Sequence, residues 1–300
     1  MKRLIVMTLT VLGLAAPAAN AALNVLSCEP EWAALTQELA GDLAEVSSAT
    51  TAQQDPHRIQ ARPSLLAKAR RADLLICTGA ELEMGWLPLL QREAGNGKIQ
   101  PGQLGYFEAA RFARIIERPT VLDRAQGDVH ASGNPHVHLD PRNIARVADG
   151  LARRLADLDP ANAARYADRH ADFQRRWTAA MAHWEQQGAR LKGVPVVAHH
   201  RNWGYLADWL GLTIIGELEP KPGMEPTASH LAELLETLKA TPARMVLRTA
   251  YESPKASEWL ASRAGIPAVK LPYTVGGSPQ AKDLFGLFDD TLNRLLQAAP

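Results

Sequence analysis

The sequence predicts an α/β protein of two lobes, each a mainly parallel sheet flanked by helices, joined by one long rigid helix. Short apolar runs alternate with segments of helical periodicity in residues 22–141 and again in residues 193–300. This alternation favours parallel sheets whose faces are covered by helices. Between them, residues 161–187 contain neither glycine nor proline, which predicts a helix roughly 40 Å long. We therefore expect an N-terminal lobe at 22–141, a linking helical segment at 142–192 and a C-terminal lobe at 193–300.

The N-terminal lobe is expected to open with a buried strand and then to alternate helices with strands. The predicted strands cover residues 23–27, 45–49 and 73–78. The predicted helices cover residues 31–40, 65–71 and 86–93. Ligands of parallel sheets bind beyond the carboxyl ends of the strands. We expect His57 directly after the second strand, at the edge where a ligand would bind.

The middle of the chain is expected to be helical, and the last third repeats the α/β pattern. Large apolar side chains recur at spacings of three, four and seven residues along one face of residues 161–187, as expected for an amphipathic helix; they are Tyr166, Phe173, Trp177, Met181 and Trp184. The predicted strands of the second lobe cover residues 194–198, 212–215, 245–247 and 268–271. Its predicted helices cover residues 203–210, 227–238, 253–264 and 283–296.

Residues 1–21 have the features of a secretory signal peptide. Lys2 and Arg3 precede a short apolar stretch, and Ala19 and Ala21 fit the small-x-small rule for cleavage. The apolar stretch is too short to predict a membrane span. We therefore expect cleavage after Ala21 and a soluble protein in the periplasm.

The charge of the chain gives no reason to expect a nucleic acid partner. The formal net charge is +1, with an isoelectric point near 7.9. Lysine and arginine residues form no basic stripe in the sequence, although such a stripe is typical of proteins that bind phosphate backbones.

The two cysteines lie at equivalent places in the predicted sheet. Cys28 ends the first strand-like run and Cys77 ends the third. In an oxidising compartment a cysteine pair usually forms a disulfide. Neighbouring parallel strands would bring the two thiols together, so we expect a disulfide, with two buried free thiols as the alternative.

Three histidines lie in marked contexts that suit metal ligands. His136 stands in a proline-bounded stretch, Asn134-Pro-His-Val-His-Leu-Asp-Pro141, which also holds His138. His57 follows Asp55-Pro56, and His200 follows a predicted strand and His199. Imidazole is the commonest protein ligand for zinc and related metals. We expect the strand ends of both lobes to bring His57, His136 and His200 to one divalent metal, with His138 and His199 as additional ligands or orienting groups.

With these motifs the chain resembles the metal-binding receptors of bacterial ABC importers for zinc and manganese, the ZnuA/TroA-like family. The resemblance spans the expected mature chain, and the stretches that carry it are Asp55-Pro56-His57, Arg62-Pro63-Ser64, Ala72-Asp73-Leu74-Leu75-Ile76 with Gly79 and Leu82-Glu83, Asn134-Pro135-His136 with Leu139-Asp140-Pro141, and His200 with Gly204-Tyr205. It implies a monomer of two lobes with a rigid linking helix and His57, His136 and His200 as ligands of a buried metal. It also implies a membrane permease with its ATPase as partner. Zinc is favoured, with ferrous iron, manganese or a metal chelate as alternatives.

The chain departs from that family in two places. The family commonly supplies a fourth, carboxylate ligand from a late loop, but residues 271–277 contain no acid. Water, His138, Glu252 or Asp283 would then complete the metal shell. The long histidine-rich loop of many zinc-binding members is also missing, and only His130 remains of it.

Two other classes fit the sequence less well. A metallohydrolase would need an open site with a general base, and the chain has neither a His-Glu-x-x-His nor a Gly-x-Ser-x-Gly motif. We therefore expect no enzymatic activity. An exported adhesin, a label that some members of the family carry, would be favoured by repeats or a surface anchor, and the sequence has neither.

Overall fold

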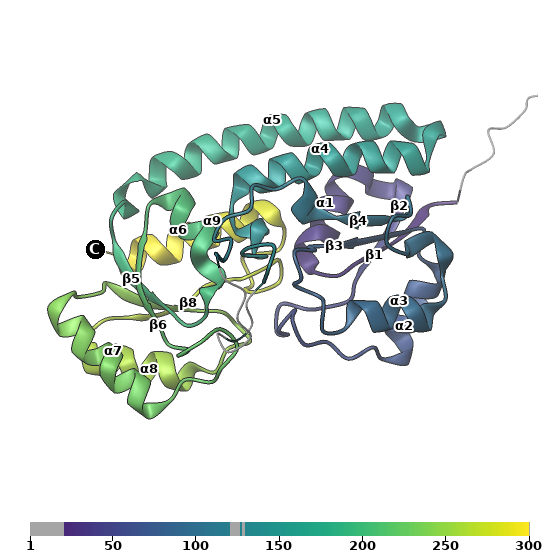
Figure 1. Cartoon of the computed structure of the whole chain (residues 1–300). Helices are drawn as coiled ribbons and strands as arrows, with labels where there is room; N and C mark the ends of the chain where they lie inside the picture. The colour runs from purple at the N-terminus through teal and green to yellow at the C-terminus, as the bar shows by residue number, and fades with distance from the viewer. Residues whose placement is uncertain (1–20, 121–126, 128–129, 300) are drawn as a thin grey trace, which may run out of the picture.

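The computed structural model describes residues 21–120, 127 and 130–299. Two α/β lobes lie side by side beneath a pair of long helices (Figure 1). The predicted signal peptide falls on residues 1–21 and so lies outside the described part of the chain except for its last residue. Within that part, no helix has both the length and the apolar character to cross a bilayer.

The N-terminal lobe is a four-stranded parallel sheet in the order β2-β1-β3-β4. Its strands are β1 (Leu23–Ser27), β2 (Ala44–Ser48), β3 (Leu74–Cys77) and β4 (Tyr106–Glu108). Its helices are α1 (Pro30–Ala40), α2 (Pro63–Arg71) and α3 (Leu87–Ala94), with single turns of 3-10 helix at Gly41–Leu43, Gly97–Ile99 and Ala109–Arg111. Alternate residues of β1 face opposite cores. Val25 packs in the core with α1, whereas Leu26 packs in the core with α2 and α3.

The C-terminal lobe repeats this arrangement, with a parallel sheet in the order β6-β5-β7-β8. Its strands are β5 (Pro195–Ala198), β6 (Thr213–Glu217), β7 (Met245–Arg248) and β8 (Ala268–Lys270). Its helices are α6 (Gly204–Leu210), α7 (Ala228–Ala240), α8 (Pro254–Ala264) and α9 (Leu284–Ala298). Short 3-10 turns at Ala189–Leu191 and Arg201–Trp203 lead into β5 and α6. The predicted fold class of two parallel-sheet lobes is confirmed.

The predicted long helix is α5 (Ala163–Gly188), which extends over both lobes (Figure 1). It contacts α1 in one lobe and α9 in the other. Trp177 and Trp184 of this helix are fully buried. The ring of Trp177 makes edge contacts with the rings of Trp184 and Phe288. The indole nitrogen of Trp184 also donates a hydrogen bond to Asp289 of α9 at 2.6 Å.

In the linking segment α4 (Pro141–Leu158) packs along α5, and a 3-10 turn at Pro160–Asn162 joins the two helices. Two details of the sequence prediction are corrected by the structure. Strand β4 was not predicted, since its three residues form no apolar run. His57 does not directly follow a strand: β2 ends at Ser48, and His57 lies in the loop that leads to α2.

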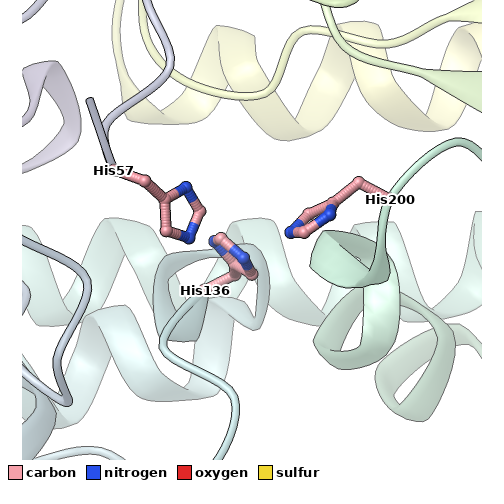
Figure 2. Close-up of side chains that lie close together, drawn as sticks. All are labelled: His57, His136 and His200. Carbon is pink, nitrogen blue, oxygen red and sulfur yellow. The ribbon is translucent and has the colours of Figure 1, made fainter. Parts of the chain in front are cut away.

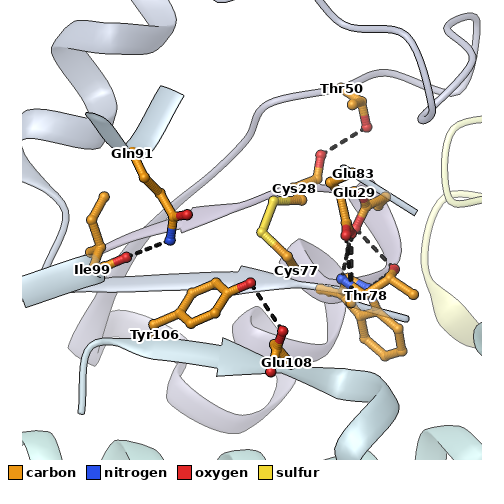
Figure 3. The surroundings of a disulfide bond; sticks show 12 residues. Cys28, Glu29, Thr50, Cys77, Thr78, Glu83, Gln91, Ile99, Tyr106 and Glu108 are labelled. Atoms are coloured by element: carbon orange, nitrogen blue, oxygen red, sulfur yellow. Dashed lines mark hydrogen bonds between the residues drawn. A yellow bond between two sulfur atoms is a disulfide. The ribbon is translucent and has the colours of Figure 1, made fainter. Parts of the chain in front are cut away.

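The cysteine pair forms the predicted disulfide (Figure 3). Strands β1 and β3 are parallel neighbours with Ser27 opposite Ile76, so Cys28 and Cys77 meet at the ends of their strands. Their Cα atoms are 4.8 Å apart, and both side chains are fully buried. Thr50 donates backbone and hydroxyl hydrogen bonds to the carbonyl of Cys28. The start of the loop that holds His57 is therefore hydrogen-bonded to a residue of the disulfide.

A pair of buried carboxyl groups, Glu29 and Glu83, lies beside the disulfide (Figure 3). Glu83 accepts hydrogen bonds from the backbone N–H groups of Thr78 and Gly79, and Glu29 accepts one from the Thr78 hydroxyl. Burial, the charge of Glu83 and the charge of Glu31 raise the pKa of Glu29 well above its ordinary value. Burial also raises the pKa of Glu83. The folded protein therefore retains protons here that the unfolded chain would lose.

We predict that the double variant Cys28→Ala/Cys77→Ala is less stable than the oxidised protein by about 4 kcal/mol. The bond closes a loop with a sequence separation of 49, and the entropic cost of closing such a loop gives that magnitude. Urea unfolding with and without a thiol reductant measures the effect. The reductant should destabilise the wild type and leave the variant unchanged; equal sensitivity of the two proteins would contradict the prediction.

We predict that the contribution of Glu29 to the stability of the wild type falls as pH rises above about 4.3, the ordinary glutamate pKa, because this carboxyl ionises first in the unfolded chain. This contribution continues to fall until the pH exceeds the raised pKa of Glu29 in the folded protein. Glu29→Gln should reduce the stability difference between pH 5 and pH 8 by at least about 1.4 kcal/mol, the equivalent of one pKa unit. Glu45→Gln, at an exposed carboxyl on β2, is the control. A Glu29→Gln profile that follows the wild type would show that this carboxyl is not the cause.

Candidate metal centre

Three imidazole rings meet between the two lobes (Figure 2). They belong to His57 in the β2–α2 loop, His136 just before the 3-10 turn at Val137–Leu139, and His200 just after β5. One ring nitrogen of each lies within 4.8 Å of the other two. The ring centroids are 5.4 to 5.8 Å apart and the planes are steeply inclined. The predicted histidine trio is therefore brought together by the fold.

His57 is fixed by the residues that precede it. The Oδ1 atom of Asp55 accepts the backbone N–H of His57 at 3.0 Å and lies 2.7 Å from Nδ1 of its ring. The carbonyl of Pro56 accepts a hydrogen bond from the buried indole of Trp86 at 2.8 Å. This tight turn holds the ring where an ordinary loop histidine would rotate freely.

His136 is fixed by contacts with the C-terminal lobe. Asn134 accepts the backbone N–H of His136 at 2.9 Å, and the Tyr205 hydroxyl donates to the carbonyl of Asn134. The hydroxyl of Tyr273, which lies beyond β8, is 2.7 Å from Nδ1 of His136. The His136 side chain is almost fully buried.

His200 is fixed in the same manner by a carboxylate beyond β6. Oε2 of Glu219 lies 2.7 Å from Nδ1 of His200. The same oxygen accepts the backbone N–H of Gly223 at 2.8 Å, which holds the carboxylate in place.

In each ring Nδ1 is engaged by an oxygen atom, which leaves Nε2 as the ligand atom. A neutral imidazole that donates from Nδ1 presents an unprotonated Nε2, and this arrangement is typical of histidines that bind metals. Nε2 of His57 is buried and has no hydrogen-bond partner among the described residues. The three rings therefore fit a divalent metal that accepts three nitrogen ligands and leaves a fourth position open.

The electrostatics of the rings differ. Burial lowers the pKa of His136 well below its ordinary value, and the neighbouring His57 and His200 lower it further. Burial would also lower the pKa of His200, but the hydrogen bond and charge of Glu219 outweigh it and raise the pKa. The most enclosed ring is thus kept neutral, which is the form that binds metal.

Two of the additional residues considered from the sequence make hydrogen bonds outside the trio. The His138 ring is fully buried, with Nε2 2.9 Å from the carbonyl of Tyr273 and Nδ1 3.2 Å from Glu31 of α1. Asp283 caps α9 by accepting the N–H of Gly286 at 2.7 Å.

The other two additional residues lie close to the trio. His199 and Glu252 line a cavity of about 170 Å³ together with His57 and His200. Burial lowers the pKa of His199 to about 4 and raises that of Glu252 to about 7. His130 also lies close, with its ring stacked on His57 at a centroid distance of 5.4 Å.

The orienting groups were the part of the site that sequence reasoning missed. Asp55 carried a signal, because an Asx residue two positions before a histidine can accept its backbone N–H. Glu219 lies in a polar loop and Tyr273 is remote in sequence, so neither carried one. All three lie beyond the carboxyl ends of strands, the place where parallel sheets bind ligands.

Comparison with known proteins finds one matching family model. The model for ZnuA, described as zinc-uptake complex component A periplasmic, matches residues 25–298. Relatives include the metal ABC transporter substrate-binding lipoprotein ScbA of Streptococcus cristatus, 28% identical over 48% of this chain and 44% of that protein. The high-affinity zinc uptake system protein ZnuA of Paracoccus denitrificans is 26% identical over 96% of this chain and 94% of its own length. The chain thus spans less than half of the first relative and nearly all of the second.

Solved structures share the fold at low sequence identity. A crystal structure of ZnuA superimposes with a TM-score of 0.72 at 24% identity, covering 92% of this chain and 100% of that one. A cadmium-bound periplasmic metal binding protein from Candidatus Liberibacter asiaticus gives 0.75 at 17% identity, covering 92% and 99%. These similarities support the two-lobed architecture.

We predict that Tyr273→Phe weakens metal binding by about 10- to 100-fold, the usual effect of losing a group that orients a metal-ligating histidine. Phenylalanine retains the ring and removes only the hydroxyl that meets His136. Competition with a chromogenic zinc chelator measures the affinity. Tyr166→Phe, which removes the remote hydroxyl that donates to Asp159, should bind as the wild type does. A folded Tyr273→Phe protein with wild-type affinity would exclude this orienting role.

Proposed function

The chain belongs to the ZnuA family of periplasmic zinc-uptake components, and from that premise we propose that it captures a divalent transition metal between its lobes and delivers it to an ABC importer. The observation that carries this proposal is the convergence of His57, His136 and His200 within 4.8 Å. Each ring has its Nδ1 atom held by a separate oxygen. Because the ligands come from both lobes, a bound ion would also cross-link the lobes.

Zinc is the metal that the donor atoms favour. Imidazole nitrogen is a borderline ligand that suits zinc and ferrous iron, whereas manganese prefers carboxylate and water oxygen. A relative from Streptococcus gordonii is named a manganese ABC transporter substrate-binding lipoprotein, so the metal can differ within the group. The alternatives to zinc remain ferrous iron, manganese and a metal chelate.

The fourth position of the metal shell is proposed for water or Glu252. Three histidines leave one tetrahedral position open. The carboxylate of Glu252 lines the same cavity as His57 and His200. His138 and Asp283 fit this role less well, since Nε2 of His138 meets the carbonyl of Tyr273 and Oδ1 of Asp283 accepts the N–H of Gly286.

We propose that the protein acts in the periplasm as a monomer, after removal of residues 1–21. Its partner would be a membrane permease with its ATPase. The lobes of the protein itself would span residues 22–141 and 193–300, with the linking segment at 142–192. The family is one of substrate-binding receptors, and we propose no catalytic activity.

We predict that zinc at a thousandfold excess over its dissociation constant raises the free energy of unfolding by about 4 kcal/mol. Alanine at His57, His136 or His200 should remove most of that increase, because two imidazoles rarely retain the ion against water. Thermal unfolding with and without zinc, ferrous iron and manganese measures the effect and ranks the metals.

His183→Ala, on the exposed face of α5, is the matched control and should retain the full zinc effect. The proposal fails if all three trio variants keep wild-type stabilisation by every metal.

A further inference from the structure

The disulfide of the N-terminal lobe lies beside a carboxylate, and together they bring three potential metal-ligand atoms into one place. The Sγ atoms of Cys28 and Cys77 and a carboxylate oxygen of Glu83 all lie within 4.8 Å of one another. All three side chains are buried, and Figure 3 shows the carboxylate next to the sulfur atoms. This cluster shares no residue with the histidine trio.

Glu83 is held in this cluster by the turn that follows β3. Its carboxylate accepts the backbone N–H of Thr78 at 2.7 Å and that of Gly79 at 3.1 Å. Each carboxylate oxygen has two lone pairs, so both atoms can still accept another partner. Carboxylates that bind metals are commonly fixed by hydrogen bonds of this kind. The Glu83 side chain is therefore oriented as a ligand would be.

The second buried carboxyl, Glu29, does not have the role that its position in the sequence suggests. It stands at the N-cap of α1, yet its side chain makes no capping hydrogen bond to that helix. Its Oε2 accepts the Thr78 hydroxyl at 3.1 Å, while its Oε1 is buried without a hydrogen-bond partner among the described residues. Burial of such a polar atom is costly and calls for an explanation.

The local charge favours a cation. After burial, the groups that raise the pKa of Glu29 are two further acids, Glu83 and Glu31. Reduction of the disulfide would add two thiols, which lose their protons when they bind a metal. Two thiolates and a carboxylate form an anionic ligand set that zinc accepts, and the soft sulfur atoms disfavour manganese and calcium.

We propose that reduction of the Cys28–Cys77 bond turns this cluster into a site for one zinc-like divalent ion, with the two thiolates and Glu83 as ligands. The disulfide takes up two electrons from the reductant, together with two protons, to give two thiols. The ion then displaces both protons, and the fourth position is left for water or Oε1 of Glu29. A two-electron thiol oxidant reverses the process by re-forming the S–S bond and releasing the ion.

The site thus belongs to a chain whose cysteines are not yet oxidised, and the disulfide closes it. Reduction both creates the thiolate ligands and removes the cross-link between the ends of β1 and β3, which frees them to admit an ion. The proposal does not rest on metal binding by the trio.

Anaerobic titration with cobalt(II) tests the proposal on the wild-type protein. A phosphine cleaves the disulfide and becomes the phosphine oxide, with water supplying the oxygen atom and the two thiol protons, and is then removed. We expect the reduced protein to bind one more cobalt ion than the oxidised protein, with thiolate-to-cobalt charge-transfer absorption in the near ultraviolet. Histidine ligands give no such band, so the trio does not interfere. A reduced protein without this band would overturn the proposal.

Variants distinguish the built site from free thiols. Glu83→Gln should weaken cobalt binding by the reduced protein by about tenfold or more, since a ligand matters at least as much as the groups that orient one. Glu93→Gln, at an exposed carboxyl of α3, is the matched control and should bind as the wild type does. An unfolded reduced chain would bind cobalt through its thiols regardless of residue 83, so wild-type affinity in Glu83→Gln would contradict the proposal.

Thermal unfolding decides the matter if Glu83→Gln does not fold. An ion that binds only the folded state stabilises it. Cobalt should therefore raise the unfolding midpoint of the reduced wild type by more than it raises that of Cys28→Ala/Cys77→Ala, which lacks both thiols. Equal shifts in the two proteins would overturn the proposal.

Discussion

The site depends on three hydrogen bonds that each fix one imidazole ring from its Nδ1 side. Asp55, Tyr273 and Glu219 supply the oxygen atoms, all at 2.7 Å. Without them, three rings packed between two lobes could rotate and bury their nitrogens without partners. With them, Nε2 of each ring is directed to a common point before any ion arrives. A metal bound as proposed would then meet a preorganised set of ligands and would not have to order them itself.

The same region joins the two lobes through a buried polar network. Glu31 of α1 accepts a hydrogen bond from Thr274, which follows β8, and lies 3.2 Å from Nδ1 of His138. The other nitrogen of His138 meets the carbonyl of Tyr273, whose hydroxyl meets His136. The His138 ring thus faces both Glu31 of α1 and the carbonyl of Tyr273 from the C-terminal lobe. Together with α5, which rests on α1 and α9, this network favours a molecule that admits metal through loops rather than by wide opening of the lobes.

Sequence reasoning predicted what local pattern and strand order determine. The positions of Cys28 and Cys77 at the ends of two strands were enough to expect their disulfide. Prolines beside His57 and His136, and the predicted strand before His200, were enough to nominate the trio. It could not assign His138, because the groups that face its ring, Glu31 and the carbonyl of Tyr273, are remote from it in the sequence. Nor could it find the roles of Tyr273 and Glu219, which are separated from their histidines by 137 and 19 residues. Hydrogen bonds between residues so far apart in the chain leave no periodic signal in a single sequence.

The central claim is that one metal ion is held by the three Nε2 atoms. X-ray absorption spectroscopy of protein loaded with one equivalent of zinc tests it most directly. The account predicts a first shell of four light atoms, with the multiple-scattering signature of three imidazoles and Zn–N distances of about 2.0–2.1 Å. A shell of oxygen atoms with one imidazole or none would contradict it.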